Sequence, residues 1–161
     1  PRYGSLRVEL EKRISEFAEF LSDRQQEPLR PNAIEITYVN QVPLTGDFSI
    51  LSDIVSIIQP APVELGSPIE TNLSVRFDVS EQLRRDSANL VVNVQRSSNV
   101  DPPLAILQLS CTSPVDGLAD ALKGLDQARY HVVQSFLSIT TARSHEKWGS
   151  RDDRRCLDGH E

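Results

Sequence analysis

The side chains that could do chemistry in this sequence are few and widely spaced. Its three histidines, His131, His145 and His160, have no metal-ligand spacing among themselves, and a zinc site needs three or four convergent ligands. The chain has no glycine-rich phosphate loop and none of the patterns H-E-x-x-H, G-x-S-x-G or C-x-x-C. The sequence therefore predicts no metal, no cofactor and no catalytic residue.

Two polar residues interrupt apolar patterns and are the candidates for contacting a ligand. Asn40 lies in "IEITYVNQV" on the same strand face as Tyr38. Its amide either bonds backbone groups at residues 43–47 or lines a cavity between a sheet and a helix. Arg129 falls within the apolar stripe of a long helix, where it either pairs with a carboxylate or carbonyls or anchors an acidic ligand. In a pocket, Tyr38, Asn40 and Arg129 would be the polar lining.

A third candidate is the segment "SITTARSHEKWG", which contains the only tryptophan of the chain. A histidine beside a carboxylate, as in His145-Glu146, can take part in acid–base catalysis. The alternative is that Trp148 packs a short helix against the core while His145 and Glu146 face water. We favour this second interpretation.

Alternating apolar and polar residues predict the strands that must position these side chains. The clearest strand is "IETNLSVRFDVS", residues 69–80, in which Leu73, Val75 and Phe77 point one way and polar residues point the other. Further strands are expected at 33–42, 88–95 and 104–111. Since each strand has one apolar and one polar face, an antiparallel sheet is predicted.

Apolar residues at spacings of three and four predict helices before and after the strands. The first covers residues 5–24 and the longest covers about 116–139. A short helix follows at 142–148, and Thr141 can cap it. The segment "FSILSDIVSIIQ" is ambiguous, and its apolar spacing fits a short helix better than a strand.

These elements predict an α+β fold in one domain. We expect a four-stranded, mainly antiparallel sheet with the long C-terminal helix on its apolar face and an N-terminal helix, an outline shared by helix-grip and hotdog-like folds. The domain would span residues 1–149, followed by a charged tail at 150–161. Because the chain begins with Pro1 and contains no methionine, we expect it to be the C-terminal part of a longer protein.

Charge and cysteine content restrict the partners that we expect. A net charge of −6 disfavours nucleic-acid binding, which usually requires a basic surface. No apolar run approaches the roughly 20 residues of a membrane span. Two cysteines, Cys111 in a strand and Cys156 in the tail, are too few for a disulfide framework and indicate a reducing, cytoplasmic compartment.

The segments "ITYVNQV" and "LDQARYHVVQSFLSITTARSHEKWG" resemble the TIGR04255 family of sporadically distributed bacterial proteins. The matching positions are Tyr38-Val39-Asn40, Arg129, Phe136, Ile139-Thr140-Thr141, His145 and Trp148-Gly149. The resemblance covers roughly residues 30–149 and implies a further N-terminal segment with additional strands. Where some members carry histidine this chain has Arg129, which disfavours a catalytic histidine at that position. The resemblance implies no particular activity.

The function that we expect from these features is a non-enzymatic module that binds a protein or a small ligand. The alternative is a small-molecule-binding protein or enzyme with a pocket between the sheet and the long helix. A third hypothesis is homo-oligomer formation through an exposed sheet edge.

Overall fold

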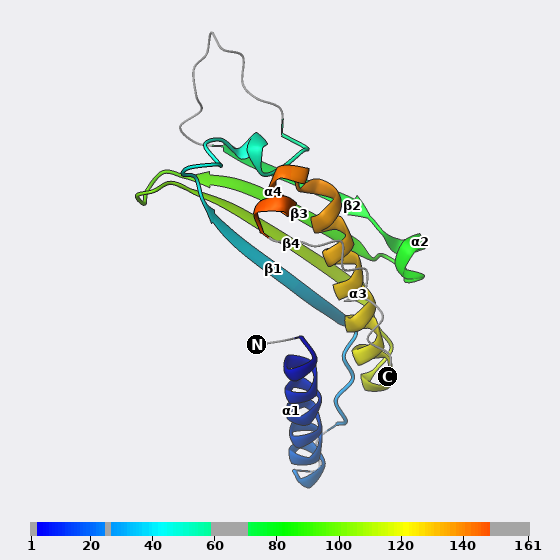
Figure 1. Cartoon of the computed structure of the whole chain (residues 1–161). Coiled ribbons are helices and arrows are strands. Elements are labelled where there is room, and N and C mark those ends of the chain that lie inside the picture. Colours follow the sequence, from blue (N-terminus) through cyan, green and yellow to red (C-terminus); the bar gives the residue numbers. More distant parts are fainter. Residues whose placement is uncertain (1–2, 25–26, 59–70, 149–161) are drawn as a thin grey trace.

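The computed structural model describes residues 3–24, 27–58 and 71–148. Its elements follow one another as α1 (Tyr3–Asp23), β1 (Ala33–Pro43), the 3₁₀ helix η1 (Leu51–Asp53), β2 (Thr71–Asp78), α2 (Ser80–Leu83), β3 (Asn89–Ser97), β4 (Leu104–Pro114), α3 (Leu118–Ile139) and α4 (Ala142–Lys147) (Figure 1). The predicted α+β fold is confirmed. The expected tail at 150–161, with Cys156, lies outside the described residues.

The four strands form one antiparallel sheet in the order β1-β4-β3-β2. Residues directly opposite one another on paired strands point to the same face of a sheet. Tyr38 pairs with Leu109, Leu109 with Val92, and Val92 with Val75, so one row of inward-facing side chains crosses all four strands. The period-two pattern of the sequence therefore identified the inward-facing residues of β1 and β2 correctly.

The long helix α3 lies diagonally over the apolar face of the sheet (Figure 1), and its main contacts are with β1 and β4. Ala128 and Val132 of α3 are fully buried, as is Leu109 of β4 beneath them. Phe77, on the same face of β2, is 42% exposed. The helix is therefore placed off-centre and leaves the β2 edge of the sheet less covered.

The short helix expected within residues 48–59 forms in part, as the 3₁₀ helix η1. Among the described residues of this segment, η1 is followed by turns, and Val55 makes an isolated β-bridge with Thr140. The Ser56 N–H donates to the Ile139 carbonyl at 2.7 Å, and Ile54 and Val55 are fully buried. Local bonds such as that from the Val55 N–H to the Leu51 carbonyl stop after η1, and hydrogen bonds to the end of α3 follow them. Apolar spacing does not report such tertiary contacts.

The first helix, α1, stands apart from the sheet (Figure 1) and has no buried residue. Its apolar stripe is largely exposed, as Leu6 and Phe17 illustrate. Contacts between α1 and α3 are made by Tyr3 and Arg7, which both bond the Asp126 carboxylate. The helix is therefore held by polar contacts at its first two turns rather than by burial of its apolar stripe.

Candidate functional site

Two of the three predicted ligand-contacting residues meet on the β1 side of α3. The Arg129 Nε donates to the Tyr38 hydroxyl at 3.1 Å. The Arg129 guanidinium also lies over the ring of Tyr3, 4.1 Å from its centroid, a cation–π geometry. Arg129 is therefore engaged by two tyrosines of its own chain, neither of which is the carboxylate or carbonyl partner that we expected.

The Tyr3 ring is fixed in this position by Asp126, which the sequence did not single out. The Tyr3 hydroxyl donates to Asp126 Oδ1 at 2.7 Å, and Arg7 Nε donates to both carboxylate oxygens at 3.1 and 3.0 Å. Partial burial and the bond to Asp126 raise the pKa of Tyr3, so its hydroxyl stays protonated and continues to donate. This side of α3 is closed by contacts within the chain.

Asn40 lies on the same strand face as Tyr38 and pairs with Leu107 of β4. It is half-buried. Within the described residues it makes no hydrogen bond to Arg129, and it is not among the residues that line the groove described next. The structure thus brings Tyr38 and Arg129 together and leaves Asn40 out of their contact.

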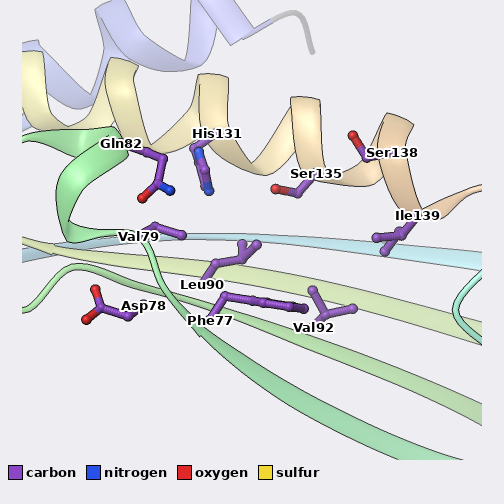
Figure 2. A pocket seen from close by; sticks show the side chains of 10 residues that line it. All are labelled: Phe77, Asp78, Val79, Gln82, Leu90, Val92, His131, Ser135, Ser138 and Ile139. Carbon is purple, nitrogen blue, oxygen red and sulfur yellow. The ribbon is translucent and has the colours of Figure 1, made fainter.

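A groove of about 260 Å³ lies on the opposite side of α3, between that helix and the β2–β3 part of the sheet. We call it the α3 groove. It is lined by Phe77, Asp78, Val79, Gln82, Leu90, Val92, His131, Ser135, Ser138 and Ile139. Figure 2 shows its floor formed by apolar side chains of the sheet, while His131 and Ser135 project towards it from the helix above.

Helix geometry explains why the α3 groove and the Arg129 cluster lie on opposite sides. Each residue turns an α-helix by about 100°, so Arg129 and His131 point about 160° apart around the axis. The fully buried Val132 lies between them. Ser135 falls one turn after His131 and Ser138 nearly two turns after it, which produces a polar stripe along the edge of the buried face.

One end of the groove is formed by α2, in the connection between β2 and β3 (Figure 2). Gln82 of α2 projects towards the groove. The segment that follows α2 is tied to α3 by a two-pronged ion pair, in which the Arg85 guanidinium bonds both oxygens of Asp120, with Nη2 to Oδ1 at 2.8 Å. This contact holds the amide of Gln82 near His131 and Ser135.

The described lining of the α3 groove includes the titratable side chains Asp78 and His131. The Asp78 carboxylate points away from the floor (Figure 2) and accepts from the Ser80 N–H at 2.9 Å. The bonds from Ser80 lower the pKa of Asp78. Burial without a compensating charge lowers the pKa of His131, so the imidazole is mainly neutral at neutral pH.

The C-terminal residues of the family resemblance, from Phe136 to Trp148, form a joint between α3, α4 and the segment around η1. The Thr140 hydroxyl and His145 Nε2 are 2.6 Å apart, and Thr141 Oγ1 donates to the Asp53 carbonyl at 2.6 Å. Trp148 stacks on Phe136 with ring centroids 5.7 Å apart. The packing role of Trp148 is as expected, whereas His145 bonds Thr140 and does not simply face water. This corrects the expectation for His145.

Other chemistry is not evident in the part of the chain that the structure describes. No group of three or more His, Cys, Asp or Glu side chains there could hold a metal ion. Burial raises the pKa of Cys111 to about 11, so its thiol is protonated and a poor nucleophile. Among the described helices, none has the length and apolar character that crossing a bilayer requires.

No protein-family model, curated protein or solved structure matches the chain.

Proposed function

We propose that this protein is a non-enzymatic binding module that holds a small ligand in the α3 groove. The observation that carries the proposal is the division of the groove into an apolar floor and a hydrogen-bonding roof. Phe77, Leu90 and Val92 supply the floor. An apolar pocket with a few convergent polar groups is the usual composition of a ligand site in proteins.

The volume of the groove limits the size of the ligand. Drug-sized ligands occupy pockets of about 300–1,000 Å³, and a cavity of about 150 Å³ accommodates benzene. The α3 groove, at about 260 Å³, lies between these values. It suits a molecule built on one aromatic ring, or an apolar group of similar size, that carries a polar substituent.

Binding is favoured over catalysis because the polar groups of the groove are not paired in a catalytic arrangement. A nucleophilic hydroxyl needs a base within hydrogen-bond reach. In the region that the structure describes, no hydrogen bond joins His131 to Ser135 or Ser138; the Ser138 hydroxyl instead donates to the Gln134 carbonyl at 2.9 Å. His131 is therefore proposed as a binding group and not as a general base.

Thermal unfolding with and without p-cresol tests this proposal. A ligand at ten times its dissociation constant stabilises the folded state by about 1.4 kcal/mol, which raises the melting temperature by a few degrees. Ser135→Phe should remove the shift because its ring fills the groove. Ala119→Phe is the matched control, since Ala119 is an exposed residue of the same helix. Equal shifts in both variants, or none in the wild type, would contradict the proposal.

Self-association through the edge of β2 is a second proposal, favoured by one observation. Among the described strands, β2 pairs with β3 alone, and the inward-facing Phe77 near that edge is 42% exposed. Free strand edges are templates for pairing with another chain. Light scattering at increasing protein concentration should show a rising mass, and a constant monomer mass would count against this idea.

The similarity to the TIGR04255 family remains part of the proposal, as does a cytoplasmic location. Thr140, Thr141, His145 and Trp148, four of the positions that carry this similarity, form one compact joint at the end of α3. In this proposal the joint supports the helix that carries the groove and does not bind the ligand itself. His145→Ala should therefore lower thermal stability and leave the affinity for p-cresol unchanged, whereas lost affinity in a folded variant would contradict this division of roles.

A further inference from the structure

We infer that the ligand of the α3 groove is an electrically neutral ring compound whose hydroxyl or amide group bonds the neutral polar side chains of the roof. The inference rests on the function proposed above and adds the chemical class of the ligand. It follows from the charges that line the groove and from the hydrogen-bonding groups that face its interior.

Among the described residues, the groove offers no fixed positive charge for an acid. Of the ten residues that line it, none is a lysine or an arginine. The nearest negative group, Asp78, is at the rim and its lowered pKa keeps it ionised at neutral pH. An ionised carboxylate entering the groove would lose its hydration without gaining an opposite charge, which is costly in an apolar environment.

A cationic ligand is disfavoured for a related reason. Asp78, the carboxylate among the described lining residues, points away from the floor (Figure 2) and accepts from the Ser80 N–H. An ammonium group over Phe77, Leu90 and Val92 would have no carboxylate directed at it. Burial of such a charge without a partner carries the same desolvation cost.

Neutral donors and acceptors, in contrast, face the groove from two helices. A neutral imidazole has one N–H donor and one nitrogen acceptor, a hydroxyl both donates and accepts, and an amide has two donors and an acceptor. His131 and Ser135 provide the first two and Gln82 the third. A hydroxyl or an amide on the ligand matches this set because it also both donates and accepts.

The inference makes a prediction about pH that distinguishes it from acid binding. The groups facing His131 are the apolar floor, the neutral Gln82 and Ser135, and Asp78 at the rim. Protonation of His131 removes its acceptor and places a charge beside the floor. The affinity for a neutral ligand should therefore fall as the pH decreases through the lowered pKa of His131, whereas a carboxylate would gain affinity by binding the imidazolium.

Isothermal titration with four probes of similar size tests the class of ligand: p-cresol, benzamide, benzoate and benzylamine. At about pH 7.5, where His131 is neutral, the two neutral probes should bind at least about tenfold more tightly than the two charged ones, a difference of about 1.4 kcal/mol. The neutral-probe affinity should decrease between about pH 7.5 and about pH 5. In His131→Gln, which cannot titrate, it should not change with pH.

The outcomes separate this inference from the proposed function. Benzoate or benzylamine binding as tightly as the neutral probes, with binding abolished by Ser135→Phe, would overturn the neutral class and leave the groove as a ligand site. The same pH dependence in His131→Gln as in the wild type would overturn the role of His131. Failure of all four probes to bind the wild type would overturn both the inference and the function on which it rests.

Discussion

Both sides of α3 carry polar residues, but these residues make opposite kinds of contact. On the β1 side, Arg129 is engaged by Tyr38 and Tyr3, and Asp126 holds Tyr3 in place, so the polar groups satisfy one another. On the β2 side, His131 and Ser135 project over an apolar floor and leave a groove of about 260 Å³. We call these the closed side and the open side of α3.

The difference follows from where a single helix can lie on a sheet of four strands. Neighbouring strands are about 4.8 Å apart and a helix with its side chains is about 10 Å wide, so one helix covers about two strands. Because α3 packs on β1 and β4, coverage is poorest at β2, where Phe77 is 42% exposed, whereas Leu90 and Val92 of β3 remain buried. A polar stripe at the edge of α3 then faces apolar strand residues, which is the arrangement of an amphipathic binding groove.

The largest contrast between the two sides should come from adding a ring to α3. Ala128→Phe forces a ring into a fully buried position against the sheet and should lower the free energy of unfolding by about 3 kcal/mol or more, since overpacking strains a filled core. Ser135→Phe places the same ring in the open groove and should change it by less than about 1 kcal/mol. Urea unfolding of both variants measures this, and equal costs would remove the distinction between the sides.

Truncation of inward-facing leucines sharpens the same contrast. Leu109→Ala leaves a cavity in the fully buried row and should cost about 2–5 kcal/mol of unfolding free energy. Leu73 of β2 faces the same way but is only half-buried, so Leu73→Ala should cost about half as much. Chemical denaturation of the pair would contradict the account if Leu73→Ala were the more damaging change.

A smaller change in unfolding free energy is expected at Gly124, where α3 lies against the start of β1 and the residue after β4. A methyl group added at Gly124 would lie 2.9 Å from Val115 Cγ1 and 3.3 Å from Ile34 Cδ1. Gly124→Ala should therefore lower the unfolding free energy by about 1 kcal/mol, because the clash exceeds the gain in helix propensity. Gly4→Ala in α1 has open space around it and should be neutral or stabilising, and a stabilising Gly124→Ala would show that α3 packs less tightly against Ile34 and Val115 than the contacts indicate.

The smallest effect concerns the pH dependence of stability. The pKa of His131 is lowered in the folded protein by burial, so the unfolded chain binds its proton more readily. The stability that depends on the neutral imidazole is present above its unfolded pKa of about 6.5 and is lost as the pH falls through the lowered folded value. The melting temperature should therefore decrease less between about pH 7.5 and about pH 5 in His131→Gln than in the wild type, and identical decreases would place the imidazole in solvent.

Much of this fold could be predicted from the sequence because its strands alternate regularly. Leu73, Val75 and the residues opposite them fall on one face as the period of two requires. The short helix expected at 48–59 is present as η1, but the β-bridge after it was not predicted, because there Ser56 bonds the end of α3, a contact between distant parts of the chain. Local spacing carries no information about such a contact.

The candidate site was harder to predict than the fold. Arg129 drew attention because a charge inside an apolar stripe is unusual, but its partners are internal tyrosines. The open side depends on the lateral position of α3, which apolar periodicity does not determine. A signal was nevertheless present, because His131, Ser135 and Ser138 recur at helical spacing beside the stripe.

The central claim, that the open side of α3 is the binding site, is tested most directly by a backbone NMR titration of the whole chain with p-cresol. The account predicts saturable chemical-shift changes at Phe77, Leu90, His131 and Ser135, and unchanged signals at Tyr38 and Arg129. Shifts confined to Tyr38 and Arg129, or no saturable shift at any residue, would contradict it.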